Sequence, residues 1–233
     1  MSTNKTAHPP LASGADPKLK PSSGAAPGSG KRRSQAERTA ETRSRLIDAT
    51  IDCLIDSGYS GTTTVAVCKR AGVSHGSLLY HYGTRERLLG AALDAVYQRL
   101  RRPVVESLEQ LPLGEERVDA LVELMWAAFG AREFKAVLEL WLAASNQSEV
   151  GWAVWPEADD FDRAIQPLAE HLFPDVAERM PDFSLYISLI FQVLQGMGLA
   201  HATWPHDEED PIRARVRELL ARLVRDAFRV SAK

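Results

Sequence analysis

Residues 62–88 read TTTVAVCKRAGVSHGSLLYHYGTRERL, and this stretch decides the fold. Two short segments with helical patterning, residues 63–71 and 75–82, flank a turn. Gly72 stands where a chain leaves a helix through a left-handed conformation, which favours glycine. Ser74 stands where a second helix begins, a position that favours serine. The stretch therefore predicts a helix-turn-helix.

The second of these helices has the features of one that enters a DNA major groove. It is short, and it ends in the polar and aromatic run Tyr80-His81-Tyr82. A serine cap leaves backbone N–H groups at the positive end of the helix, where they suit a phosphate.

The remainder of the chain predicts more helices, and no stretch reads as a strand or hairpin. We therefore expect an all-α fold. A helix beginning at Ser34 is expected to end at Ser57-Gly58, and Thr84 is expected to cap another helix. Further helices are expected near residues 118–129, 134–141, 157–172, 183–204 and 212–228.

Composition predicts a tail and two modules. Residues 1–33 are rich in Pro, Gly, Ser and Ala and are predicted to be a disordered tail. Its basic run Lys31-Arg32-Arg33 is interpreted as an arm that touches DNA, with nuclear targeting as the alternative. Residues 34–100 are predicted to form the DNA-binding domain, and 101–233 a helical effector-binding and dimerisation domain, with Pro103 and Pro112 marking the link. The charges support this division, because residues 31–102 sum to +6 and residues 103–233 to −11.

Several classes of protein are disfavoured. Two cysteines in 233 residues argue against a disulfide scaffold, and their spacing does not fit a zinc finger. We expect no metal, no cofactor and a cytoplasmic location. Residues 183–204 are long and apolar enough to form a membrane-spanning helix, but two glutamines and two glycines favour a helix that is buried against protein.

An all-helical enzyme is the rival class, and we expect no enzyme. The chain has no nucleotide-binding loop, no His-Glu-x-x-His and no Gly-x-Ser-x-Gly. The acidic clusters Asp159-Asp160 and 207–210 are interpreted as solvated loop charge. Cys68 is interpreted as a small core residue, with a redox sensor as the alternative.

The helix-turn-helix closely resembles that of the TetR family of bacterial transcriptional regulators. The resemblance spans about residues 40–96. It rests on Ala71-Gly72-Val73-Ser74, then on the x-Gly-x-Leu-x-Tyr-His-aromatic pattern of residues 75–82, then on a basic residue with Glu-x-Leu at 85–88. Thr64, Cys68 and Tyr82 depart from the family's usual residues in size or polarity.

The resemblance implies DNA contacts at eight positions. The hydroxyl groups of Thr63, Ser74 and Tyr80 are expected to contact phosphate. His81 is expected to contact phosphate or to pack, and Arg85 replaces the family's common lysine as a phosphate contact. His75, Ser77 and Leu79 on the second helix are expected to contact base edges. For His75, the alternative is an exposed polar residue with no base contact. The predicted DNA-binding residues are Thr63, Ser74, His75, Ser77, Leu79, Tyr80, His81 and Arg85.

The resemblance also implies a helical second half that binds a ligand and forms a dimer. Residues 183–204 and 212–228 are expected to form the homodimer interface. A pocket for a mainly apolar or planar effector is expected among the middle helices, lined by Trp126, Phe129, Trp141, Trp155 and Phe161, with Gln195 or His201 as polar contacts. Packing in the core is the alternative for Trp126 and Trp141.

The function implied is a ligand-responsive regulator, a repressor that binds a pseudo-palindromic operator as a homodimer and is released by a small molecule. The alternatives are an all-helical enzyme, or a protein-interaction module whose helix-turn-helix does not bind DNA.

Overall fold

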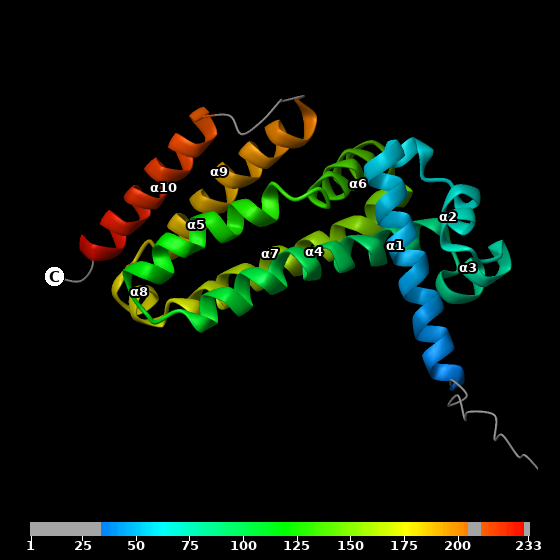
Figure 1. Cartoon of the computed structure of the whole chain (residues 1–233), viewed down its shortest axis with the longest axis horizontal. Helices are drawn as coiled ribbons and strands as arrows, with labels where there is room; N and C mark the ends of the chain where they lie inside the picture. Colours follow the sequence, from blue (N-terminus) through cyan, green and yellow to red (C-terminus); the bar gives the residue numbers. More distant parts are fainter. Residues whose placement is uncertain (1–33, 205–210, 231–233) are drawn as a thin grey trace, which may run out of the picture. The chain divides into compact units, whose positions relative to one another are not determined.

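The computed structural model describes residues 34–204 and 211–230, and within these ranges it contains ten helices and no strand. Figure 1 shows their arrangement. The helices are α1 (Gln35–Gly61), α2 (Thr64–Ala71), α3 (His75–Tyr82), α4 (Arg85–Gln110), α5 (Glu115–Phe129), α6 (Phe134–Asn146), α7 (Ser148–Leu172), α8 (Pro174–Arg179), α9 (Phe183–Thr203) and α10 (Pro211–Val230). The all-α fold predicted from the sequence is thus confirmed for these residues.

The first three helices and the start of α4 share a small core. Leu46 from α1, Leu78 from α3 and Leu88 from α4 are each almost completely buried in it. Cys68 on α2 is also buried, and burial raises the pKa of its thiol, so it belongs to the core as expected. Tyr82 on α3 is buried in the same core, and its hydroxyl donates to the carbonyl of Arg43 on α1.

Two further cores hold the other helices together. One joins α1, α4, α6 and α7, with Leu93, Leu140 and Val154 at its centre. The other joins α5, α9 and α10 with α8 and the ends of α4 and α7, around Leu108 and Leu194. Helices α4 and α7 run side by side, which Figure 1 also shows.

The α4–α7 crossing depends on a glycine. Gly90 is buried, and a Cβ added there would lie 2.5 Å from the backbone oxygen of Ala153 on α7. We expect Gly90→Ala to lower the free energy of unfolding by about 1–3 kcal/mol, because the backbone of α7 must move away. Urea denaturation followed by circular dichroism measures this change.

The matched control is Gly76→Ala in the exposed face of α3. The nearest outside atom to a Cβ there is Ser74 Oγ at 3.9 Å, so alanine is expected to stabilise the helix by up to about 1 kcal/mol. Equal responses from the two alanine variants would contradict the close crossing.

Proline positions give the main differences from the sequence prediction. Pro103 lies inside α4 and does not mark a link, and the boundary expected at residue 100 falls within the same helix. Leu108 beyond the proline is completely buried, and this burial helps to offset the hydrogen bond that a proline removes. Helix α7 begins at Ser148 and not near 157, with Pro156 in its interior.

The remaining helix ends lie close to their expected positions. The backbone of Gly58 has φ 67° and kinks α1 where the sequence predicts its end, although one more turn follows. Helix α5 ends at Phe129 and α6 begins at Phe134, as the sequence predicts for both ends. The short helix α8 was not predicted, and the expected tail over residues 1–33 lies outside the described residues.

Candidate functional site

The turn before α3 has the geometry that the sequence predicts. Gly72 has φ 63° and ψ 39°, in the left-handed region, and its N–H donates to Lys69 O. Ser74 caps α3, with its Oγ accepting from the N–H of Ser77 at 3.2 Å. The turn therefore fixes the direction in which α3 leaves α2, and the cap uses one of the N–H groups at its positive end.

One face of α3 is open to solvent. His75, Gly76, Leu79 and Tyr80 are exposed, whereas Leu78 points into the core. The exposed fraction of Tyr80 is 80%, which is large for an aromatic side chain. The exposed residues include three of the predicted DNA contacts on this helix.

The other predicted contacts lie close by. Ser77 is half-buried, and the half-buried ring of His81 packs edge-to-face on Tyr80 with 5.0 Å between centroids. Thr63 is exposed and caps α2, with its side-chain oxygen accepting from the N–H of Ala66. A hydroxyl that accepts in a cap keeps its hydrogen for an outside acceptor, so Thr63 and Ser74 both retain a donor.

Arg85 makes contacts within the protein that the sequence does not predict. Its Nε donates to the carbonyl of Thr62 at 2.9 Å, and its Nη2 donates to the carbonyl of Tyr59 at 3.0 Å. Its Nη1 donates to the Tyr59 hydroxyl at 2.8 Å, and the guanidinium carbon lies 4.4 Å from the centroid of the Tyr59 ring. Arg85 therefore holds the end of α1 against the start of α4, and a phosphate contact from its remaining N–H groups stays a prediction.

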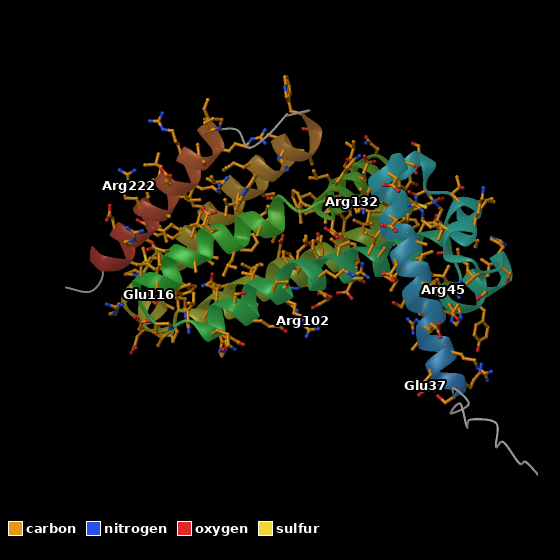
Figure 2. The ribbon with its side chains drawn as sticks, in the orientation of Figure 1. Glu37, Arg45, Arg102, Glu116, Arg132 and Arg222 are labelled. Carbon is orange, nitrogen blue, oxygen red and sulfur yellow. The ribbon has the colours of Figure 1, made fainter. Side chains whose placement is uncertain are left out.

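Arg45 is a second arginine that holds the helix-turn-helix together, and sequence reasoning missed it. Arg45, which Figure 2 labels, lies on α1, and its Nη2 donates to the carbonyls of Ala71 and Gly72. A Cβ at position 72 would lie 2.8 Å from the same nitrogen. Glycine at this corner thus serves both the left-handed backbone and the approach of the arginine.

Helix α6 contacts the end of α1 through polar groups. Glu139 Oε2 accepts from the N–H of Tyr59 at 2.8 Å, and Lys135 Nζ donates to the carbonyl of Ile55 at 2.8 Å. At the α6–α7 corner, Gln147 Oε1 accepts from the Tyr59 hydroxyl at 2.8 Å. The tyrosine that Arg85 holds is therefore also held by α6.

An ion-pair cluster reinforces this contact. Arg132, labelled in Figure 2, lies between α5 and α6 and donates to Asp56 Oδ1 at 2.8 Å. Arg70 on α2 donates to the other oxygen of Asp56 at 2.7 Å. Hydrogen bonds from Arg70 and then Arg132 lower the pKa of Asp56. The cluster is exposed, so its contribution to stability is small.

A cavity of about 570 Å³ lies among α4, α5, α6, α7 and α9. That volume falls within the usual range for small-molecule sites. Most of its lining is apolar, and six lining residues are charged or polar at neutral pH besides Tyr97. The aromatic residues are Tyr97, Phe129, Phe134, Trp141, Trp155, Phe161, Phe173 and Phe191, and the others are Arg101, Asp159, Asp162, Ser188, Gln192 and Gln195.

Five of the seven residues expected at an effector pocket line this cavity, namely Phe129, Trp141, Trp155, Phe161 and Gln195. Trp126 and His201 do not. Their rings pack edge-to-face with 5.7 Å between centroids, and the guanidinium carbon of Arg217 lies 5.1 Å from the Trp126 ring centroid. These two residues contribute to the packing of α5, α9 and α10 and lie outside the lining of this cavity.

Tyr97 is the cavity residue that sequence reasoning missed most clearly. Its ring stacks on Phe161, with 4.2 Å between centroids and 16° between planes. Its hydroxyl oxygen accepts from Trp141 Nε1 at 3.0 Å. Burial raises the pKa of Tyr97, and the negative charge of Asp162 raises it further. The three aromatic rings thus form a fixed wall beside a carboxylate.

Asp159 and Asp160 lie on α7 and not in a loop, which corrects the sequence interpretation. Asp159 lines the cavity, whereas Asp160 pairs with Arg163. Within residues 34–204 and 211–230 no three His, Cys, Asp or Glu side chains come together as a metal site. The acidic cluster over residues 207–210 lies outside the described part of the chain.

The outer faces of α9 and α10 expose large apolar side chains. The inner faces of both helices pack on α5, with Ile190 on α9 and Val224 on α10 among the buried residues. The exposed residues are Leu185, Leu189 and Leu199 on α9 and Ile212, Leu219 and Leu223 on α10. Helix α9 is also long and apolar enough to cross a membrane, a test that the core helices of soluble proteins pass as well.

Comparison with known proteins places these features in a family. The sequence profile described as "bacterial regulatory proteins, tetR family" matches residues 46–92, which include α2, α3 and the turn between them. An HTH-type transcriptional regulator of Mycobacterium tuberculosis is 25% identical over 76% of this chain and 90% of its own length. The HTH-type transcriptional regulator CymR of Pseudomonas putida is 25% identical over 77% of this chain and 88% of its own.

Solved structures show the same fold. A transcriptional regulator from Pseudomonas aeruginosa PAO1 superimposes with a TM-score of 0.63 at 22% identity, covering 84% of this chain and 99% of that one.

Proposed function

Because the chain belongs to the TetR family and is a DNA-binding transcriptional regulator, we propose that it is a repressor that binds a pseudo-palindromic operator as a homodimer and is released by a small molecule. In this proposal α1 to α3 and the start of α4 form the DNA-binding part, and the remaining helices bind the effector and the second subunit. We expect it to act in the cytoplasm, on the chromosome.

The observation that carries the DNA-binding part is the exposed face of α3 behind a fixed corner. His75, Ser77 and Leu79 would meet base edges, and the hydroxyls of Ser74, Tyr80 and Thr63 would meet phosphates, with His81 supporting Tyr80. Contacts from α3 to a DNA groove require side chains that the core leaves accessible, and His75, Leu79 and Tyr80 are exposed.

The exposed leucines on α9 and α10 support a homodimer through these two helices. An apolar face on two adjacent helices is costly in water, and the same face on a second copy is complementary to it by two-fold symmetry. Two subunits joined in this way would present two copies of α3 to successive major grooves.

The cavity supports control by an effector. It is lined by α6, the helix that contacts the end of α1 through Glu139. A ligand that favours another position of α6 would therefore also change how the DNA-binding part is held, which is the differential preference that allostery requires.

Selection of bound duplexes from a random pool tests the proposal. The full chain is expected to enrich a pseudo-palindrome with half-sites about one helical turn apart. Binding without enrichment, or no salt-dependent binding, would overturn the DNA-binding part and favour an interaction module.

Two substitutions separate backbone contacts from base contacts. Tyr80→Phe is expected to weaken binding to all sequences by about 3–10-fold, because it removes one hydrogen bond to phosphate. His75→Ala is expected to change base preference at one position in each half-site. Gel-shift titrations against the selected operator and single-base variants measure both effects, and identical profiles for the two variants would contradict the assignment.

A further inference from the structure

The charged lining of the cavity carries an inference about the effector itself, and this inference rests on the proposed function. We propose that the cavity binds an organic cation with an aromatic or other apolar body, whose positive charge lies against Asp159 and Asp162 on α7.

The aromatic lining suits such a ligand on two grounds. Apolar rings bury the body of the ligand, and the negative faces of aromatic rings attract a desolvated cation. Tyr97 and Phe161 stack as one layer, and the Tyr97 hydroxyl fixes the indole of Trp141. The wall is thus held in place before a ligand enters, which lowers the entropy cost of binding.

The two carboxylates give the charge preference. Asp159 and Asp162 are three residues apart on α7 and therefore share a face of that helix. Neither makes an ion pair or hydrogen bond with another residue of the described chain. Both residues are exposed at the mouth of the lining, and partial burial, followed by the charge of Asp159, raises the pKa of Asp162. A cation beside the two carboxylates would favour their charged forms.

Among the described residues that line the cavity, one is cationic, and it opposes this preference only in part. Arg101 lies on α4, and its Nη2 donates to Gln98 Oε1 at 2.6 Å. Two carboxylates against one guanidinium leave the lining with a net negative charge, which favours a cation over an anion of the same shape.

Three probes of matched shape test the charge preference on the full chain. They are benzyltrimethylammonium, its neutral carbon analogue neopentylbenzene, and phenylmethanesulfonate. Quenching or shift of tryptophan fluorescence reports binding, because Trp141 and Trp155 line the cavity. We expect the cation to bind at least tenfold more tightly than either other probe. Equal or tighter binding of the neutral or anionic probe would overturn the inference.

Variants locate the charge. Asp162→Asn is expected to weaken binding of the cation at least fivefold and to leave the neutral probe unchanged, whereas Arg101→Gln is expected to strengthen binding of the cation. Asp160→Asn is the matched control, because Asp160 lies on the same helix outside the lining and pairs with Arg163. Cation affinity that is the same in Asp162→Asn and in the control would overturn the inference even if the cation binds.

Operator titrations distinguish this inference from the function on which it rests. Release of operator by the neutral or anionic probe at a concentration equal to or lower than that required of the cation would overturn the charge preference and support effector control. Tight binding of the cation, lost in Asp162→Asn, without any change in operator affinity would support the charge preference and overturn effector control.

Discussion

Replacing Leu189 and Leu223 together with arginine is expected to separate the proposed homodimer into monomers and to weaken operator binding roughly 100-fold or more. The two leucines lie on the outer faces of α9 and α10, with exposed fractions of 51% and 55%. In a dimer each arginine would be buried against apolar side chains without a partner, at a cost of several kcal/mol. A monomer holds only one half-site, so it loses the gain that comes from linking two binding events.

The fold itself is expected to survive this double substitution, because neither leucine belongs to the cores around α5. Leu142→Arg is the matched control. Leu142 is 66% exposed and lies on α6, which is not part of the proposed interface. Sedimentation equilibrium gives the mass of each variant, and gel-shift titration gives its operator affinity. A double variant that remains a dimer would show that the two subunits meet elsewhere.

Gly76→Glu is expected to abolish operator binding, with a loss of roughly 100-fold or more, while the protein stays folded. Gly76 is the second residue of α3 and lies on its exposed face. The nearest atom to an added Cβ, apart from the helix itself, is 3.9 Å away, so the substitution meets no obstacle within the protein. In the proposed complex a carboxylate at this point would face the phosphates and the acceptor-rich edges of the groove.

Two controls separate charge from size and from general acidity. Gly76→Ala adds only a methyl group, and we expect it to cost much less affinity than glutamate does. Ser145→Glu adds the same charge at an exposed position of α6 and should leave operator binding almost unchanged. Circular dichroism checks that all three variants keep their helices. Wild-type affinity in Gly76→Glu would contradict the placement of α3 in the groove.

Local signals explain why so much of the helix-turn-helix is predictable from the sequence. The glycine at position 72, the serine at 74 and the threonine at 84 each act through the backbone of their own few residues, and each has the expected cap or turn. Thr84, for example, accepts from the N–H of Arg87. Such short-range preferences do not depend on the remainder of the fold.

Contacts between distant residues explain most of what the sequence does not reveal. Tyr59 and Glu139 are 80 residues apart, and Arg45 is 26 residues from Ala71. No spacing rule connects such pairs, because their distance depends on how whole helices pack. The hydrogen bonds of Arg85 within the protein were missed for the same reason, because their acceptors lie on α1 and in the turn after α1.

Some residues of the cavity lining could be predicted from the sequence and others could not. Its aromatic residues on α6 and α7 stand out in the sequence as a group, so several were identified. Tyr97 and Leu100 were not, because they lie on α4 in the part assigned to DNA binding, and α4 continues past Pro103 into the cavity wall. Asp159 and Asp162 lie within the helix expected near residues 157–172, but they were missed as lining residues because the sequence does not show which face of that helix meets α4 and α9.

Helix α6 lines the cavity with Trp141 and holds the end of α1 with Glu139. If α6 couples the cavity to the DNA-binding part, thermodynamic linkage makes the coupling reciprocal. The factor by which the effector lowers operator affinity is then also the factor by which the operator lowers effector affinity. Protein already seated on the chromosome would then be the less sensitive detector, and the unbound pool would respond first when the inducing compound enters the cell.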